Sequence, residues 1–357
     1  MLERPHRALT LPLVLALAPA ALAGGSGGEE WLTLDRELEV LSASLAPQSP
    51  GMQVGALLRT NYAWFEESPV TPGEHYSGFA FDNIRAFFEG QAGPATVHLS
   101  LEAQSGTALV LDAYGRMPVT EDVRVTVGQF LPAVLRSGLV DPQNQLFILR
   151  TTPGAFWHAR DQGVELGADL DRVLVRASFL NGADGVGDDP AFCVRADWSA
   201  VNSVPWVEGA YGSGRQTALV VGASYYDDAG ALADGDVISV DALLTTDRFS
   251  FGGEFQSYGD DGGVDPGNGI KNGLYGNLSD SSPWAASASF MVDPDKYELG
   301  VRYEVLDDQY DASAVTVGLN AYLAGHDLMW QFNYTQVASD RADQDGGALG
   351  IGLTVHI

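Results

Sequence analysis

The side chains most able to do chemistry in this sequence are its histidines and its single cysteine, and their spacing matches no catalytic motif that we recognise. After the first segment, the histidines are scattered over the chain at His75, His98, His158, His326 and His356. The sequence contains no His-Glu-x-x-His or Cys-x-x-Cys motif and no phosphate-cradling glycine loop. Cys193 is the only cysteine, so it can form no intramolecular disulfide. We therefore predict neither an enzymatic activity nor a cofactor.

An acidic, glycine-rich stretch over residues 259–283 is the best candidate for binding a cation. Its oxygen-bearing side chains include Asp260, Asp261, Asp265, Asn268, Asn277 and Asp280. Carboxylate and amide oxygens are the ligands that Ca²⁺ prefers, but the fixed spacing of an EF-hand is absent. A solvated acidic loop is the better explanation of the composition, so no metal site is predicted.

The charge balance narrows the classes of partner. The formal net charge is -28, and lysine occurs only at positions 271 and 296. So acidic a chain is unsuited to nucleic acid or to an anionic membrane surface. Most of the carboxylates are interpreted as solvated groups on exposed loops.

The first 23 residues have the layout of a secretory signal peptide. Arg4 and Arg7 form a basic start, an apolar stretch runs from Leu9 to Ala18, and Ala21-Leu22-Ala23 is a small-x-small cleavage site. A transmembrane anchor is the alternative, but the apolar stretch is short and interrupted by prolines. Beyond it no segment is long and apolar enough to span a bilayer as a helix, so the exported product is either soluble or a closed barrel.

Residues 24–50 are predicted to form a flexible spacer, Gly24 to Gly28, followed by a short periplasmic helix. Its apolar residues are spaced by three and four, as in a heptad seam, at Trp31, Leu34, Leu38, Leu41 and Leu45. A helix of about four turns is marginal in water on its own. We expect it to associate with copies of itself, and the alternative is that it packs on the rest of the protein.

From Gly51 to Ile357 the helical period gives way to alternation with period two. In residues 297–305, Tyr297, Leu299 and Val301 share one face, while glutamates and arginines take the other. Residues 95–104, 123–130 and 347–357 repeat the pattern. Alternation of this kind means strands with one apolar and one polar face, which both a soluble sandwich and a membrane barrel contain.

Three features favour the barrel. The polar face carries charges along the length of the strands, as a water-filled lumen requires. Aromatic residues lie near strand ends on the apolar face, where an interfacial girdle needs them, at Phe88, Trp198, Trp284, Tyr297, Tyr303, Trp330 and Tyr334. Short turns also alternate with longer acidic loops.

The loop lengths predict an all-β fold, a sixteen-stranded antiparallel transmembrane β-barrel over residues 51–357. The predicted strands are 52–65, 79–90, 95–104, 108–117, 123–130, 162–169, 172–180, 191–200, 217–226, 236–245, 248–258, 284–292, 296–305, 314–323, 327–337 and 347–357. An even number places both ends in the periplasm and the long loops outside. A seventeenth strand near 205–211 would invert every later loop, so 201–215 is predicted to be a long turn.

Part of the sequence resembles the phosphate-selective porin O and P family of the outer membrane. The resemblance lies in Asp112-Ala-Tyr-Gly-Arg116, in Val123 to Phe130 with its Thr-Val-Gly-Gln-Phe, and in the link that ends Pro153 to Val164. It resumes over residues 298–305 and 319–334 and loosely covers most of 51–357. The final Ile357 departs from the phenylalanine with which outer-membrane barrels usually end.

The resemblance implies a trimeric barrel whose loop 131–160 folds into the lumen and narrows it. The matching arginines are Arg136, Arg150 and Arg160, which with Asp141 are the candidate pore constriction. Fixed positive charges in a narrow aqueous pore attract anions. Alternatively, these arginines pair with Asp141, Asp161 or a wall carboxylate and only hold the loop in place.

The predicted lumen wall carries both signs of charge, which implies weak discrimination between ions. The candidate lining residues are Arg85, Glu102, Asp112, Arg116, Arg124 and Arg302. Further inward-facing charges are expected at Glu89, Glu165, Arg176, Arg195, Asp197, Asp241, Glu254, Glu298 and Glu304. The family's anion selectivity relies on many lysines, which this chain lacks, so phosphate selectivity does not follow.

The function expected from these features is passive diffusion of small hydrophilic solutes or ions through an outer-membrane porin, with at most a weak anion preference. The expected partners are outer-membrane lipid, small anions or other hydrophilic solutes, and two further copies of the chain. Two alternatives stay open. One is a binding or adhesion barrel that acts through its acidic loops, and the other is a secreted soluble β-sandwich enzyme.

Overall fold

The computed structural model describes residues 52–66, 74–103, 107–182, 190–228, 235–259, 281–307, 310–340 and 345–357. The predicted signal peptide, spacer and heptad seam therefore lie outside the described residues, as do the oxygen-bearing side chains of the acidic stretch at 260–280.

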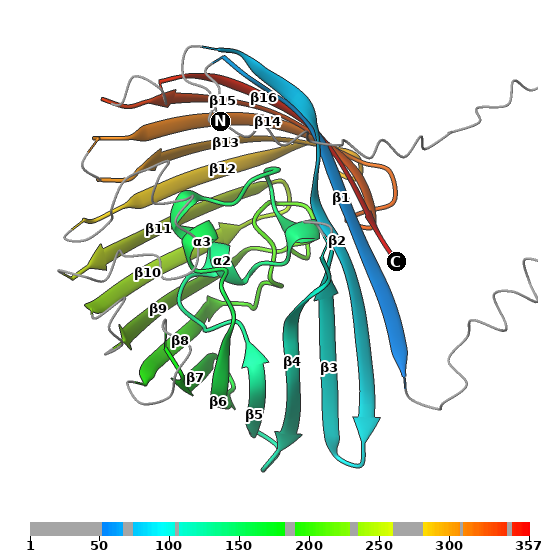
Figure 1. The fold of residues 1–357 in the computed structure, drawn as a ribbon, viewed down its shortest axis with the longest axis vertical. Coiled ribbons are helices and arrows are strands. Elements are labelled where there is room, and N and C mark those ends of the chain that lie inside the picture. The colour runs from blue at the N-terminus through cyan, green and yellow to red at the C-terminus, as the bar shows by residue number, and fades with distance from the viewer. Residues whose placement is uncertain are drawn as a thin grey trace, which may run out of the picture. The chain divides into compact units, whose positions relative to one another are not determined.

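Sixteen strands occur in the described part of the chain (Figure 1). They are β1 (Gln53–Phe65), β2 (Tyr76–Ala92), β3 (Ala95–Glu102), β4 (Leu109–Pro118), β5 (Val123–Phe130), β6 (Asp161–Leu170), β7 (Val173–Leu180), β8 (Ala191–Val201), β9 (Ala218–Asp228), β10 (Gly235–Thr245), β11 (Phe249–Tyr258), β12 (Trp284–Asp293), β13 (Tyr297–Val305), β14 (Ser313–Tyr322), β15 (Leu328–Ala338) and β16 (Gly346–His356). All sixteen predicted strands are confirmed, and the largest difference is at β2, which begins at Tyr76 rather than at residue 79.

The strands form one closed antiparallel barrel in which each pairs with its neighbours in sequence and β1 pairs with β16. Backbone hydrogen bonds between Ala56 and Ile357, at 2.9 and 3.0 Å, extend this closing seam to the last residue. Closure leaves no unpaired sheet edge. The predicted fold class is confirmed, and the alternative of two packed sheets is wrong.

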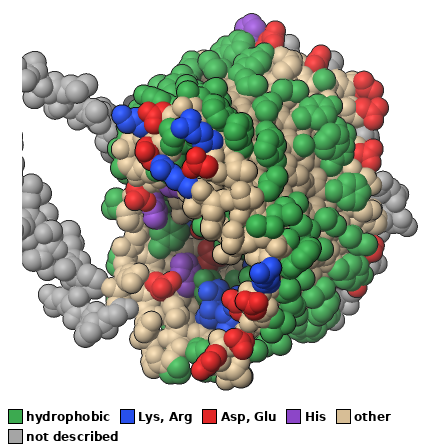
Figure 2. Space-filling view, turned by 180° about the vertical axis from the view of Figure 1, so that it is seen from behind, with side chains coloured by type: hydrophobic (Ala, Val, Ile, Leu, Met, Phe, Trp, Pro, Cys, Tyr) green, Lys and Arg blue, Asp and Glu red, His purple; other side chains and the backbone are tan. Residues whose placement is uncertain are grey.

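The outward face of the barrel is apolar because the strands alternate as their sequences predict. On β13 the exposed residues include Tyr297, Leu299 and Val301, whereas Glu298 and Arg302 face inward and are buried. Figure 2 shows hydrophobic side chains over a broad part of the outer surface, beside a hollow where charged side chains and histidines gather. This is the inside-out arrangement of a barrel with a polar interior.

Two connections matter for the interior. We call the end of the barrel where β1 begins and β16 ends the terminal end, and the opposite end the loop end. The connection between β5 and β6 starts at the loop end and contains α2 (Arg136–Leu139), the 3₁₀ helix η1 (Pro142–Asn144) and α3 (Thr152–Phe156). In Figure 1 both α-helices lie inside the ring of strands. The connection at 202–217, at the terminal end, contains no strand, as predicted.

No helix in the described part of the chain is long and apolar enough to cross a membrane.

Candidate functional site in the barrel lumen

Loop 131–160 crosses the lumen and is held on the far wall by hydrogen bonds to its backbone. Arg59 on β1 donates to the Ile148 carbonyl at 2.8 Å, and the Ile148 N–H donates to Asn333 on β15 at 2.7 Å. Arg302 on β13 donates to the Leu149 carbonyl at 2.9 Å. Charged and amide side chains of the wall therefore satisfy the backbone of the loop tip, which would otherwise be buried without partners.

Glycines on the inward face make room for this loop tip. A Cβ at Gly318 on β14 would lie 3.2 Å from the Phe147 ring, and one at Gly350 on β16 would lie 3.0 Å from Ile148 Cδ1. Phe147 is only 1% exposed and Ile148 only 6%. The loop tip thus packs against bare backbone, and a side chain at either glycine would crowd it.

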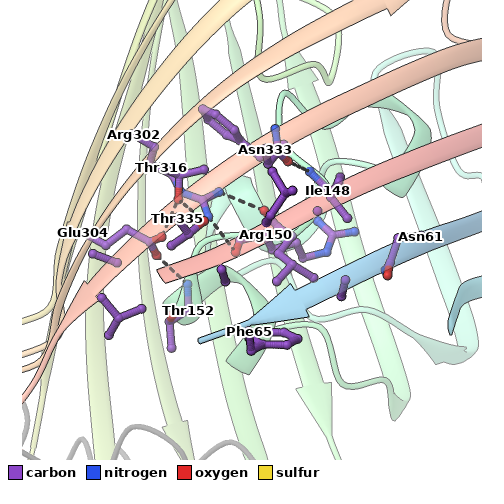
Figure 3. Close-up of a pocket in the computed structure, with 18 of the residues that line it drawn as sticks. Asn61, Phe65, Ile148, Arg150, Thr152, Arg302, Glu304, Thr316, Asn333 and Thr335 are labelled. Atoms are coloured by element: carbon purple, nitrogen blue, oxygen red, sulfur yellow. Dashed lines mark hydrogen bonds and ion pairs between the residues drawn. The ribbon is translucent and has the colours of Figure 1, made fainter. Parts of the chain in front are cut away.

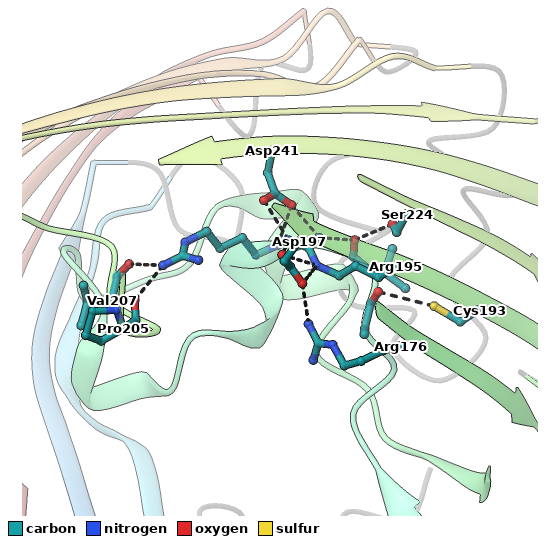
Figure 4. A network of polar contacts seen from close by, with 11 residues as sticks. Arg176, Cys193, Arg195, Asp197, Pro205, Val207, Ser224 and Asp241 are labelled. Carbon is teal, nitrogen blue, oxygen red and sulfur yellow. Dashed lines mark hydrogen bonds and ion pairs between the residues drawn. The ribbon is translucent and has the colours of Figure 1, made fainter. Parts of the chain in front are cut away.

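The other end of the loop is fixed by a buried charge network on β8 and β10 (Figure 4). Arg195 lies between two carboxylates, with its guanidinium 2.5 Å from Asp197 and 2.7 Å from Asp241, and its side chain is fully buried. It also donates to the Val134 carbonyl at 3.0 Å. Asp241 accepts in turn from the Arg136 N–H at 3.2 Å. Because each charge has an opposite partner, the network anchors the loop without leaving an unpaired buried ion.

A second segment, the 202–217 connection, enters the lumen from the terminal end. The Glu298 carboxylate, fully buried on β13, accepts hydrogen bonds from the Ala210 N–H at 2.6 Å and from the Tyr322 hydroxyl at 2.5 Å. The Tyr211 ring stacks on Tyr322 with centroids 3.8 Å apart. This second insertion was not predicted, because the sequence indicates only a long turn at 201–215.

The two inserted segments contact each other in the middle of the barrel. The Leu146 N–H donates to Glu208 at 3.0 Å, and Arg136 donates to the carbonyls of Pro205 and Val207 at 2.8 and 3.2 Å. Together they fill much of the lumen beside strands β8 to β13. Most of the remaining space lies beside β1 and β2, and near the loop end it also borders β13 to β16.

Three cavities follow one another on that side, in the order of the residues along β1 and β2. The outer cavity, of about 260 Å³, lies beside Asn61 to Phe65 and is shown in Figure 3. The middle cavity, of about 490 Å³, lies beside Arg59 and Asn83. The inner cavity, of about 600 Å³, lies beside Gln53 to Gly55. The series runs from the loop end to the terminal end.

Arginines stand where consecutive cavities meet. Arg150 of the inserted loop lines both the outer and the middle cavity, and Arg85 and Arg160 line both the middle and the inner one. Arg85 is 3.0 Å from Glu102 on β3, and Arg160 is 3.1 Å from Asp112 on β4. Each boundary between cavities therefore carries at least one fixed positive charge.

Arg150 differs from the other two boundary arginines. Within the described residues it forms no ion pair with a carboxylate; it donates instead to the Ser137 carbonyl, and the Gln145 amide lies against it. Burial, reinforced by the nearby Arg59 and Arg160, lowers the pKa of Arg150 to about 9. The guanidinium is therefore still charged at neutral pH.

His158 lies behind these arginines on the loop, with Nδ1 3.0 Å from the Gly138 carbonyl. Burial holds the pKa of His158 well below its usual value, and the positive charges of Arg150 and Arg160 lower it further. His158 is therefore neutral at physiological pH and acts as a hydrogen-bonding group of the loop.

The structure separates the four residues predicted to form the constriction. Arg150, Arg160 and Asp141 line the series of cavities, whereas Arg136 is only 7% exposed and lines a small void between the inserted loop and the wall of β10 to β13. Arg136 therefore lies apart from the other three predicted constriction residues. Its guanidinium is occupied by the 202–217 backbone, a partner that the sequence analysis did not consider.

The predicted wall residues divide in a similar way. Arg85, Glu102, Asp112 and Arg116 line the middle or inner cavity. Arg302 lines the outer cavity but is paired with Glu304 at 2.9 Å and holds the loop. Arg124 lines none of the three cavities and lies over Gly167 on β6.

The remaining candidate residues for chemistry do not assemble into a site. Cys193 is buried and its Sγ lies 3.5 Å from the Ala133 carbonyl, so it serves as packing. No group of three or more His, Cys, Asp or Glu side chains that could hold a metal ion occurs among the residues described.

The fold is of the class found in outer-membrane porins. A variant of the Rhodobacter blastica porin is similar to this chain with a TM-score of 0.58 and 13% identity, over 86% of this chain and all of that one. A loop-deletion mutant of OmpT, an outer membrane protein of Vibrio cholerae, is similar with a TM-score of 0.57 and 13% identity, over 86% of this chain and 99% of that one. No family model and no curated protein matches the sequence. The comparisons thus support a porin-type barrel and do not extend to the phosphate-selective porin O and P family.

Proposed function

We propose that this protein is a passive diffusion channel of a bacterial outer membrane, and that solutes pass along β1 and β2 through the three cavities. The order of the cavities along these two strands is the observation that carries the proposal. A membrane barrel whose interior is polar provides such a route for hydrophilic solutes. The inserted segments restrict the route to one side of the lumen.

Residues 1–23 are, in this proposal, a signal peptide that is removed on export. An even number of strands then places the terminal end in the periplasm and the loop end at the cell exterior. The acidic stretch at 259–283 would accordingly face outward.

The arginines between the cavities favour anions weakly. A guanidinium about 4 Å from an ion contributes on the order of 4 kcal/mol at an effective dielectric near 20, and charges farther off are screened over about 8–10 Å at physiological salt. Opposing this, the inner cavity also presents Glu89, Asp112, Asp141 and Glu165. We therefore expect a modest anion preference set by Arg150, Arg85 and Arg160.

The route can be tested by cysteine accessibility in planar bilayers. The single native cysteine is buried, so single cysteines introduced at Ala80, Asn83 and His98 report on the outer, middle and inner cavities. A bulky, charged thiol reagent should reduce the current in all three variants. Ser239→Cys, inward-facing but fully buried on β10, is the matched control and should not respond. Reaction at position 239 without reaction at 83 and 98 would place the route on the other side of the lumen.

We further propose that three copies assemble, with the seam from Trp31 to Leu45 joining periplasmic helices. This rests on the heptad spacing alone. Leu34→Asp combined with Leu38→Asp would put charges into the seam, where their desolvation is costly. The oligomer should then dissociate at a lower temperature on a heat-modifiability gel, and an unchanged oligomer would mean that the barrel walls alone hold it together.

A further inference from the structure

The outer cavity has a lining unlike that of a water-filled pore. Its wall on β1, β2, β14 and β16 is made largely of small or apolar residues, among them Ala63, Gly78, Ala80, Ala314 and Ala348. Lumen-facing positions of a porin-type barrel are normally polar. A cluster of apolar positions on the inward face therefore needs an explanation other than contact with lipid.

The floor of this cavity is also apolar. It is formed by the loop tip, where Phe147 and Ile148 are buried against the wall but Leu149 is 61% exposed. Leu149 lines both the outer and the middle cavity. A single exposed leucine on an outer surface is ordinary, but this one faces into a cavity whose walls are also largely apolar.

One charge of the outer cavity forms no ion pair within the described residues, although it is hydrogen-bonded to the Ser137 carbonyl and the Gln145 amide. Arg302 and Glu304 neutralise each other at 2.9 Å, and Glu304 also accepts from the Thr152 N–H at 2.8 Å (Figure 3). Arg150, next to Leu149, has no carboxylate partner within the described residues. The cavity thus presents an apolar surface beside one unneutralised guanidinium, whose planar donors match a carboxylate.

We propose that the outer cavity is a selectivity site for small monocarboxylates that carry an apolar body, with the apolar part against Leu149 and the carboxylate on Arg150. The volume, about 260 Å³, is just below the range of roughly 300–1,000 Å³ that holds drug-sized ligands, so it suits a body the size of a single ring. The proposal rests on the channel function above and specifies which anions the channel concentrates at its outer mouth.

Benzoate, acetate and benzamide are suitable probes because they separate the apolar body from the charge. Added on the outer side of a bilayer that carries chloride current, benzoate should reduce the current in a saturable way. Burial of its ring should make the half-blocking concentration at least about tenfold lower than that of acetate. Benzamide, which has the ring but no charge, should also be weaker than benzoate. Equal effects of benzoate and acetate would overturn the proposal.

Two variants test the residues. Leu149→Ser should raise the half-blocking concentration of benzoate about fivefold while changing that of acetate little, because it removes apolar contact only. Arg150→Gln should weaken benzoate and leave benzamide unchanged. Val119→Ser, an equally exposed apolar residue in the β4–β5 turn, is the matched control and should behave as the parent. Parent-like benzoate block in Leu149→Ser would refute the site.

Failure of the site and failure of the channel give different results. Chloride current without discrimination between benzoate and acetate would keep the channel and remove the site. If no current is found, calorimetric titration of the detergent-solubilised protein with benzoate still reports on the cavity, and saturable binding that Leu149→Ser weakens would keep the site without the channel.

Discussion

Arg160, at the end of the inserted loop where β6 begins, forms an ion pair with Asp112 on β4, with Arg160 Nε 3.1 Å from Asp112 Oδ1. Asp112 also accepts from the Ser100 hydroxyl at 2.5 Å. The pair joins the loop to the wall at the boundary between the middle and inner cavities. It both positions the loop and neutralises a charge that passing ions would otherwise meet.

Replacing Asp112 with Asn should therefore increase the anion preference. The change keeps the shape of the side chain but leaves the Arg160 charge unneutralised, and the wall loses one negative charge. Reversal potentials in a salt gradient should move towards the value for anions, most strongly at low ionic strength. Glu121→Gln, an exposed acid in the β4–β5 turn, serves as the control. A shift of equal size in both variants would mean that overall charge, and not this pair, is responsible.

The arginines of the inserted loop should separate into two groups by phenotype. Arg150→Gln and Arg160→Gln should each shift the reversal potential towards cations. Arg136→Gln should leave it unchanged but destabilise the protein by about 1–3 kcal/mol, because two buried carbonyls lose their donor. Thermal unfolding on heat-modifiability gels measures the second effect. A selectivity change in Arg136→Gln with unaltered stability would contradict its assignment to the contact between the inserted segments.

The strands could be predicted because the residue pattern of each strand reflects the surroundings of its two faces. The alternation on β13 between Tyr297 or Leu299 and Glu298 or Arg302 follows from lipid on one side and a polar interior on the other, so a local pattern is sufficient. Arg59 was missed because Leu57 and Leu58 both precede it and hide the period. An arginine in the middle of a membrane strand is nevertheless costly on the lipid side, and that signal could have placed it inward.

The interior could not be predicted in the same way, because it depends on which residues meet across the barrel. Nothing in the local sequence around Gly318 and Gly350 shows that Phe147 and Ile148 pack on them. The same holds for Glu298, which was predicted as a lumen charge and instead binds the backbone of Ala210. Long-range partners of this kind also determine the position of Arg136, whose guanidinium binds the Pro205 and Val207 carbonyls.

Glu298→Ala should widen the pore. Glu298 is the shared acceptor for the Ala210 N–H and the Tyr322 hydroxyl. Its removal leaves the buried Tyr322 hydroxyl without its acceptor and Ala210 with only the Ser289 hydroxyl, which loosens the 202–217 segment. Single-channel conductance should rise and become noisier as the part of the lumen filled by the 202–217 segment opens. Asp247→Asn, in the exposed turn between β10 and β11, is the control. Unchanged conductance in Glu298→Ala, with the barrel intact by its gel shift, would show that the segment does not limit flow.

Acid should lower the stability of the folded barrel with its inserted loop, and protonation of His158 should account for part of the effect. The pKa of His158 is held well below the ordinary value of 6.5 in the folded protein, by burial and by Arg150 and Arg160. The unfolded chain therefore takes up a proton near pH 6.5 that the folded chain does not. The contribution of His158 to the free energy of unfolding is fully present above that pH and is lost as the pH falls below it. Each unit of difference between the two pKa values contributes about 1.4 kcal/mol to the free energy of unfolding.

The temperature of heat modification should fall between pH 7 and pH 5. It should fall less in His158→Gln, which keeps a donor for the Gly138 carbonyl. His75→Gln, at an exposed position, should show the parent's full decline. If His158→Gln declines as steeply as the parent, the acid sensitivity arises from other groups.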